Sequence, residues 1–285
     1  MNLKHHRLGT ALAGLSLLMI CGVSAVAWGE TAKSAPKAAQ PACDLASFHL
    51  VVDVGHTPNG GARSARGVAE YDYNLGLATE IVQALLDGGF VKTTLLLIDD
   101  PKRAALFKRT ERANKLAADL FLSIHHDSVP VKFLEKWEFE GEEYGFSDRF
   151  KGHSIFISKD NPDFKGSLLF GQLIGRALKE RGLQYTPHYT EAFMGNRRRE
   201  LVDTAAGVYR YDQLIVLRQT RMPAVLLEAG SIINRDEELE LRRPERRALI
   251  TASVLDAVDR FCALRPRSKS DSTARQAKPK PKPKP

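Results

Sequence analysis

The sequence predicts an α/β fold: a single domain with a twisted, mostly parallel β-sheet of about six strands flanked by helices. Apolar runs alternate with helical patterns between residues 48 and 124, as in parallel strands joined by helical crossovers. Polar groups follow several of these runs, which is expected where strands end at a ligand-binding edge. The 285 residues suffice for one large domain, so we expect its active site at the carboxyl ends of the strands.

The first half of the chain gives the clearest alternation. The helix expected first has apolar side chains on one face, and Gly88-Gly89 follows it, where a left-handed residue commonly ends a helix. The predicted order is a strand at 48–54, a helix at 74–87, a strand at 91–98, a helix at 104–117 and a strand at 120–124.

The second half is less regular. An insert at 131–151 is rich in acidic and aromatic residues, and neither it nor residues 185–211 match a pattern that we can place. The other predicted elements are a strand at 154–157, a helix at 167–181, short strands at 214–217 and 224–227, and a helix from about 244 to 262.

The net charge of +8 resides at the two ends of the chain. Residues 265–285 hold eight Lys or Arg and one Asp, a net of +7, and residues 1–27 carry +2. The segment between therefore has a net charge of −1. A folded body without basic bias argues against a nucleic-acid-binding protein.

The N-terminus is typical of a secretory signal peptide. Lys4 and Arg7 precede a mostly apolar run at 8–23, and Ala25-Val26-Ala27 fits the small-x-small cleavage pattern. A membrane anchor is the alternative, although the run is short for a span. No other stretch is apolar enough to cross a bilayer, so we expect an exported, periplasmic or extracellular protein without a transmembrane segment.

Removal of the signal peptide on export would also remove Cys21. It would leave two cysteines, Cys43 and Cys262, which flank the predicted domain. In an oxidising compartment they could form a disulfide that joins the ends of the domain, or both thiols could stay free. Neither has the neighbours of a nucleophile or the spacing of a metal site. We predict the disulfide.

Three predicted strands end in His56, His125 and Glu228, and Glu70 follows the loop after the first strand. Two neutral imidazoles and one carboxylate are a known ligand set of catalytic zinc, which leaves the fourth position to water. A further carboxylate that does not bind the metal can serve as general base. Glu228 ends an apolar run, so partial desolvation should raise its pKa toward proton-transfer use.

The sequence pattern alone leaves two details of this proposed ligand set undecided. His126 is an alternative ligand to His125, and because neighbours on a strand point to opposite faces, only one of them can face the metal. Asp53 and Asn74 could orient the ligands by hydrogen bonds, or could simply cap local structure.

Four segments resemble the zinc-dependent N-acetylmuramoyl-L-alanine amidases of bacterial cell walls, in the family's order and at about its separations. Two shorter segments, Arg112-Ala113-Asn114 and Leu217-Arg218, are also similar. The resemblance covers roughly residues 48–262. The four segments are Val52-Asp53-Val54-Gly55-His56, Glu70-Tyr71-Asp72-Tyr73-Asn74-Leu75, Leu122-Ser123-Ile124-His125 and Val225-Leu226-Leu227-Glu228-Ala229-Gly230.

The resemblance implies that His56, Glu70 and His125 bind one Zn²⁺ and that Glu228 is the catalytic acid/base. It implies hydrolysis of the amide bond between N-acetylmuramic acid and L-alanine in peptidoglycan. We further expect a monomer that an activator protein could regulate. Together with the composition of the two ends, the resemblance predicts a signal peptide at 1–27, a linker at 28–47, a catalytic domain at 48–263 and a disordered basic Lys/Pro tail at 264–285.

Two other functions remain to be weighed. Zinc peptidases of the carboxypeptidase type generally set the first His and Glu three residues apart, which His56 and Glu70 are not. A non-catalytic cell-wall-binding protein of the same fold would have lost Glu228 or a ligand, and all four residues are present.

The chain departs from the family's pattern in its loops. Arg63, Arg66 and the run Arg197–Arg199 could bind the carboxylates of a peptide, since Arg pairs with carboxylates bidentately, or they could be solvated surface. The insert at 131–151 could pack as a lid, or one of its glutamates could cap the metal and inhibit the enzyme.

Overall fold

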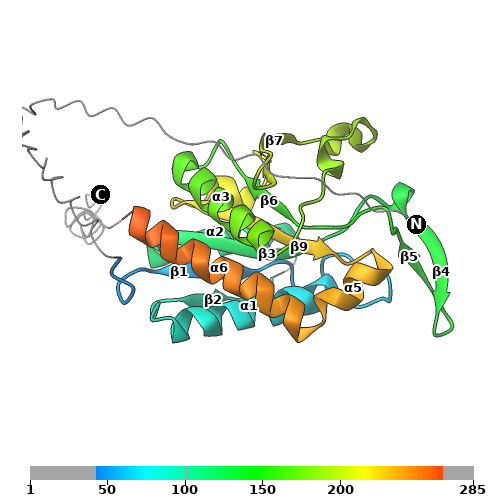
Figure 1. Ribbon diagram of the computed structural model, residues 1–285, viewed down its shortest axis with the longest axis horizontal. Helices are drawn as coiled ribbons and strands as arrows, with labels where there is room; N and C mark the ends of the chain where they lie inside the picture. Colours follow the sequence, from blue (N-terminus) through cyan, green and yellow to red (C-terminus); the bar gives the residue numbers. More distant parts are fainter. Residues whose placement is uncertain (1–42, 101, 266–285) are drawn as a thin grey trace, which may run out of the picture. The chain divides into compact units, whose positions relative to one another are not determined.

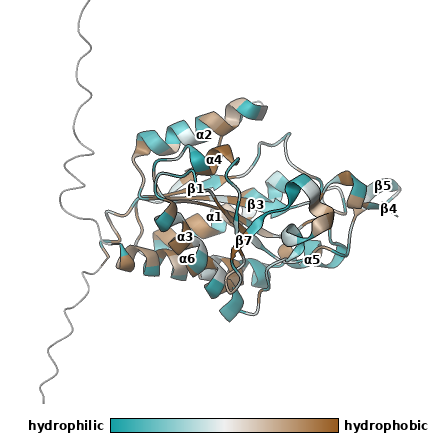
Figure 2. Cartoon of the chain, turned by 90° about the horizontal axis from the view of Figure 1, so that it is seen from above, coloured by the Kyte–Doolittle hydropathy of each residue, from teal (hydrophilic) through white to brown (hydrophobic). Residues whose placement is uncertain are grey.

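The computed structural model describes residues 43–100 and 102–265, which form a mixed sheet with helices on both faces (Figures 1 and 2). Helices α1, α3 and α6 cover one face, and α2 and α4 cover the other. The predicted signal peptide, the linker up to residue 42 and the tail beyond residue 265 lie outside the described residues. Within them, no helix is long and apolar enough to span a bilayer.

The sheet has seven strands in the order β2-β1-β3-β9-β6-β8-β7, one more than the sequence indicated. β2, β1, β3 and β9 are parallel, β6 runs antiparallel to β9 and parallel to β8, and β7 is antiparallel to β8. The mostly parallel sheet is thus confirmed. The strands are β1 Leu50–Val54, β2 Thr94–Leu96, β3 Leu120–Asp127, β6 Ser154–Ile157, β7 Glu200–Asp203, β8 Val208–Arg210 and β9 Ala224–Ser231.

The predicted helices are present, with shifted ends. One predicted strand, at 214–217, is wrong, because this apolar run forms the short helix α4 and buries Val216 and Leu217 beneath the sheet. So short a run does not distinguish a strand from a buried helical turn. The helices are α1 Glu70–Asp87, α2 Lys102–Leu116, α3 Phe164–Glu180, α4 Ile215–Arg218, α5 Arg235–Leu241 and α6 Pro244–Leu264, and the 3-10 turns are η1 Val131–Phe133, η2 His188–Thr190 and η3 Ala192–Arg197.

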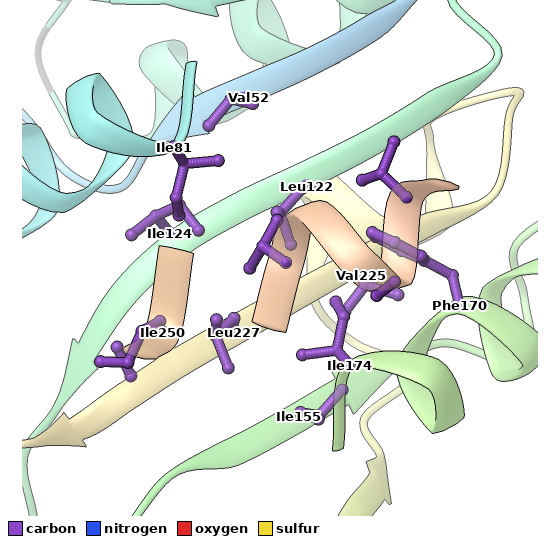
Figure 3. Close-up of a cluster of buried hydrophobic side chains, with 14 of the residues drawn as sticks. Val52, Ile81, Leu122, Ile124, Ile155, Phe170, Ile174, Val225, Leu227 and Ile250 are labelled. Atoms are coloured by element: carbon purple, nitrogen blue, oxygen red, sulfur yellow. The ribbon is translucent and has the colours of Figure 1, made fainter. Parts of the chain in front are cut away.

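The buried strands alternate between two apolar layers. Val52, Leu122 and Leu227 face the layer of α1, α3 and α6, where they meet Ile81 and Ile250 (Figure 3). The residues that precede them in the chain point to the layer of α2 and α4, as the two-residue period of a strand requires. Those residues are Val51, Phe121 and Leu226. Strands buried on both faces explain why these runs are continuously apolar in the sequence.

The insert that the sequence left unplaced contains η1 and an antiparallel hairpin of β4, Glu135–Phe139, and β5, Glu142–Phe146. The hairpin packs on the loop between β1 and α1. Trp137 Nε1 donates a hydrogen bond to the Ala65 carbonyl at 2.7 Å, and the Arg66 guanidinium lies 5.1 Å from the Trp137 ring centroid. The Tyr144 ring fills the space that a side chain at Gly67 would need. The hairpin therefore holds the loop that leads to Glu70.

The predicted disulfide is confirmed: Cys43 and Cys262 are bonded, with Cα atoms 5.3 Å apart and 219 residues apart in sequence. It joins the segment before β1 to the last turn of α6.

We expect Cys43→Ser to lower the free energy of unfolding by about 2–4 kcal/mol, because the bond restricts the unfolded chain. Denaturant unfolding of exported protein, with and without reductant, measures this change. Reductant should destabilise only the unsubstituted protein. Equal unfolding free energies for the two proteins without reductant would contradict the prediction.

Candidate active site

The structure brings His56, Glu70 and His125 together at the carboxyl ends of β1 and β3. His56 Nε2 lies 3.0 Å from Glu70 Oε2, and His125 Nδ1 lies 3.1 Å from Glu70 Oε1. One nitrogen or oxygen atom from each residue lies within 4.8 Å of the others. The two imidazole rings meet edge to face, with centroids 4.8 Å apart. The loop of thirteen residues between His56 and Glu70 thus returns to bring these two side chains together.

His56 is positioned by a buried cation. Its backbone has φ +64°, a left-handed conformation that costs free energy for a non-glycine residue. The fully buried Arg109 of α2 donates hydrogen bonds to the carbonyls of His56 and Val54. The same guanidinium donates to Asp53 at 2.5 Å, and Ser123 donates to the other Asp53 oxygen at 2.7 Å. Asp53 therefore acts on the site through Arg109.

Glu70 is the first residue of α1 and is buried. Its Oε2 accepts a hydrogen bond from the Ala62 amide at 3.1 Å, and its own amide donates to the Ala62 carbonyl at 3.0 Å, which closes the loop. Asn74, one helical turn later, donates to Oε1 at 3.2 Å. Burial opposes ionisation of Glu70, but hydrogen bonds with His125 and His56 outweigh it and hold the pKa well below its usual value.

The two neighbouring histidines point in different directions, as the strand period requires. His125 Nδ1 meets Glu70, whereas His126 Nδ1 is hydrogen-bonded to Asn74 Oδ1 at 2.8 Å and is buried. Burial lowers the pKa of His125 below its ordinary value, so the ring is neutral near pH 7. Of the pair, only His125 joins the convergent set.

The donor set fits a zinc ion. Two imidazole nitrogens and one carboxylate oxygen suit Zn²⁺, and ligands about 2.0–2.1 Å from a tetrahedral ion are about 3.3 Å from one another. Here each imidazole contacts a different oxygen of Glu70, at 3.0 and 3.1 Å, and one donor atom from each residue lies within 4.8 Å of the others, so the three side chains are near enough to share one ion. The backbone at two glycines lies close to the imidazole rings. A Cβ at Gly61 would lie 2.9 Å from the His56 ring, and one at Gly55 would lie 2.4 Å from His125 Nε2.

Glu228 lies on β9 directly opposite His125 in the parallel register of β3 and β9. Adjacent strands are about 4.8 Å apart, so its side chain stands beside the convergent set. Its Oε2 is inaccessible to solvent and has no hydrogen-bond partner among the described residues. Burial raises the pKa of Glu228 well above its usual value, and the nearby charges of Asp127 and Glu70 raise it further.

Sequence reasoning missed a buried pair next to Glu228. β3 continues past His125 to Asp127, whose two carboxylate oxygens accept the Tyr189 hydroxyl at 2.8 and 2.9 Å. Burial raises the pKa of Asp127 to about 7. The polar continuation Ser123-Ile124-His125-His126-Asp127 was the available signal. Tyr189 comes from η2, which no sequence pattern predicted.

The structure shows different surroundings for the arginines that the sequence left as either carboxylate ligands or solvated surface. Arg66 is an internal ion-pair partner: its Nη1 donates to Glu238 at 2.7 Å, and Glu238 is fully buried. Arg63 donates to the Gly67 carbonyl at 3.1 Å. Both contacts stabilise the loop before Glu70, and the Arg66 guanidinium is already paired with a carboxylate of the protein itself. Arg197 and Arg198 remain exposed.

A cavity of about 770 Å³ opens beside His56 and His125 on the α2–α4 side of the sheet. Its wall is largely apolar, and Asp99 and Asp100 lie among its polar lining residues. The lining includes Thr57, Asn59, Leu106, Leu214, Ile215 and Val216. The hydrogen bonds and ion pairs of the convergent triad involve no hairpin side chain within residues 43–100 and 102–265.

Comparison with known families gives one match: the model of the N-acetylmuramoyl-L-alanine amidases matches residues 50–260. No curated protein sequence matches the chain.

Three solved amidase structures share the fold at low sequence identity. The amidase Ami1 from Mycobacterium smegmatis is 16% identical, with 77% of this chain and 99% of that chain covered and a TM-score of 0.60. The catalytic domain of the amidase CwlV from Bacillus (Paenibacillus) polymyxa is 22% identical, over 75% of this chain and 97% of that chain, with a TM-score of 0.53. The amidase CwlD from Clostridioides difficile, solved with the GerS lipoprotein, is 18% identical, over 76% of this chain and 99% of that chain, with a TM-score of 0.55.

Proposed function

The chain belongs to the N-acetylmuramoyl-L-alanine amidase family, and we propose that it cleaves the amide bond between N-acetylmuramic acid and L-alanine in peptidoglycan with one zinc ion. The observation that carries the proposal is the convergence of His56, Glu70 and His125 beside Glu228. In this assignment the first three residues hold the metal, and Glu228 is the catalytic acid/base.

Zinc held there would polarise the amide carbonyl and lower the pKa of a bound water toward neutrality. Glu228 takes the proton of the attacking water and later delivers it to the leaving amine. Its buried Oε2 has no hydrogen-bond partner among residues 43–100 and 102–265 and is available for this exchange. The raised pKa of Glu228 strengthens the carboxylate as a base.

The remaining residues of the site would keep this geometry fixed. Arg109 holds the His56 backbone, and Asn74 orients both the Glu70 carboxylate and the His126 ring. Hydrogen bonds to ligand residues are known to raise metal affinity and activity by fixing the ligands. In this proposal Arg109 and Asn74 fix the positions of the metal-binding side chains without contacting the metal or the substrate.

We further propose that the protein acts as an exported, periplasmic or extracellular monomer on peptidoglycan, and that a partner protein can activate it. Export is supported by the signal-like residues 1–27 and by the Cys43–Cys262 disulfide, which requires an oxidising compartment. A partner is suggested by the CwlD structure, which contains a lipoprotein.

The direct test is digestion of purified peptidoglycan with and without a metal chelator. We expect new L-alanine amino termini and intact glycan strands, identified by mass, and we expect the chelator to abolish them. Release of a stem-peptide residue from the carboxyl end would instead identify a carboxypeptidase. Binding to the wall without any cleavage would identify a non-catalytic wall-binding protein.

Residues 265–285 carry +7, and we expect this segment to concentrate the enzyme on its insoluble, anionic substrate. Truncation after Leu264 should weaken sedimentation with purified wall at low salt. The difference should shrink as salt rises, since exposed charges are screened over about 10 Å at 0.1 M. Zinc content and turnover of a small soluble fragment should not change. Equal wall binding by both proteins at low salt would refute this role.

A further inference from the structure

Ser154 is the neighbour of Glu228 on the side of β9 that faces away from His125. In the antiparallel register of β6 and β9, Ser154 is the direct partner of Glu228, whose partner on β3 is His125 (Figure 1). Directly opposite residues of an antiparallel pair have Cβ atoms about 4.5–5.5 Å apart on the same face of the sheet. His125, Glu228 and Ser154 therefore form one row across three adjacent strands.

This row faces the α2–α4 side of the sheet. The adjacent residues on the same three strands, Ile124, Leu227 and Ile155, point into the layer of α1, α3 and α6 (Figure 3). Because successive side chains of a strand alternate between the two faces, the members of the row point the other way. The cavity beside the triad opens on that side, so Ser154 shares a face of the sheet with the site.

Glu228 and Ser154 each have a buried polar atom without a partner. Glu228 Oε2 and Ser154 Oγ are inaccessible to solvent and form no hydrogen bond with any residue of 43–100 and 102–265. Ser154 as a whole is fully buried. Among the residues of these ranges with such atoms, these two alone are direct partners in the sheet. An unpaired buried polar group is unfavourable, so two of them side by side indicate a polar group held between them.

The other hydroxyls near Glu228 are already committed. Ser123 on β3 donates to Asp53 at 2.7 Å, and Tyr189 donates to the two oxygens of Asp127 at 2.8 and 2.9 Å. Of the serines on the two strands that flank β9, Ser154 is therefore the one with a hydroxyl left for Glu228.

We propose that Ser154 is a positioning residue for Glu228, whose Oε2 it holds through one shared water. The proposal rests on the amidase function proposed above, in which Glu228 is the catalytic acid/base. A water at ordinary hydrogen-bond distance from both oxygens spans the gap that the strand spacing sets. A carboxylate oxygen has two lone pairs, so one can accept from this water while the other exchanges the proton. Ser154 thus fixes the direction in which Glu228 presents its base.

The test is a double-mutant cycle of Ser154→Ala and Glu228→Gln, assayed on a soluble muramoyl peptide. Alone, Ser154→Ala should lower kcat by about 10-fold, as expected for a lost hydrogen bond to a charged group, and should leave KM unchanged. In the Glu228→Gln background the same change should have little effect, because the carboxylate that Ser154 positions is gone. Thr251→Val is the matched control: it removes another buried, unpaired hydroxyl, on α6, and should leave kcat unchanged.

A merely structural role of Ser154 predicts a different pattern. Loss of packing would lower kcat by the same factor in both backgrounds and would lower the unfolding temperature. Equal factors in the two backgrounds, or an unchanged kcat in Ser154→Ala, would overturn the proposal. Failure of the unsubstituted enzyme to cleave the peptide would instead contradict the amidase function itself. Zinc content, measured for every variant, separates these effects from loss of the metal.

Discussion

Glu228→Gln should bind zinc normally and lose nearly all turnover. The amide keeps the shape of the side chain on β9 but accepts no proton at neutral pH. General acid–base catalysis is typically worth about 100- to 10,000-fold, so we expect kcat/KM to fall within that range. Cleavage of a soluble muramoyl peptide, measured beside metal content, tests both parts of the expectation.

The dependence of rate on pH gives this prediction a second readout. Burial raises the pKa of Glu228, and a general base works only when ionised. The rate of the unsubstituted enzyme should therefore fall as pH drops through this raised pKa, above the range of an ordinary glutamate. The residual activity of Glu228→Gln should not show this fall in rate at low pH. A variant that retains most of its rate on intact wall would exclude Glu228 as the base.

His56→Ala, Glu70→Ala and His125→Ala should each lose bound zinc and, with it, activity. Each change removes one of only three protein ligands in the proposed set. Loss of the Lewis acid removes several kcal/mol of transition-state stabilisation, which corresponds to about a thousandfold or more in rate. Metal analysis of purified variants and assays with added zinc measure the two effects.

Reconstitution separates loss of the metal from loss of the fold. After chelation, added zinc should restore the unsubstituted enzyme but not the three variants. Because the disulfide and the apolar layers do not depend on the ligands, circular dichroism should show folded protein in every case. Stoichiometric zinc in all three variants would reject the assignment.

The sequence predicted most of the parallel half of the sheet and the approach of the site residues. Local patterns sufficed there, because each motif joins an apolar strand to the polar group at its end. β7, β8 and the β4–β5 hairpin were not predicted. They are short, and their positions depend on partners far away in sequence, such as Trp137 on Ala65. Single-sequence periodicity contains no information on such contacts.

The sequence also did not predict the residues that position the site residues or lie next to them. Arg109 is 53 residues from His56, and within the chain it is one more basic residue of an amphipathic helix. Only the three-dimensional structure shows it to be buried against the left-handed His56 backbone. Asp127 and Tyr189 are 62 residues apart, and neither has a local pattern that would have joined them.

The Cys43–Cys262 bond also brings the two ends of the described domain together. Cys43 precedes β1, and the last turn of α6 reaches the same point, since the Phe48 and Phe261 rings are 6.4 Å apart. The chain therefore enters and leaves the domain side by side, at the amino ends of the strands. The triad and Glu228 lie at the opposite, carboxyl ends. The two ends of the described domain therefore lie at the edge of the sheet opposite the one that carries the site, so a group attached directly at Cys43 or at the end of α6 would not stand over the triad.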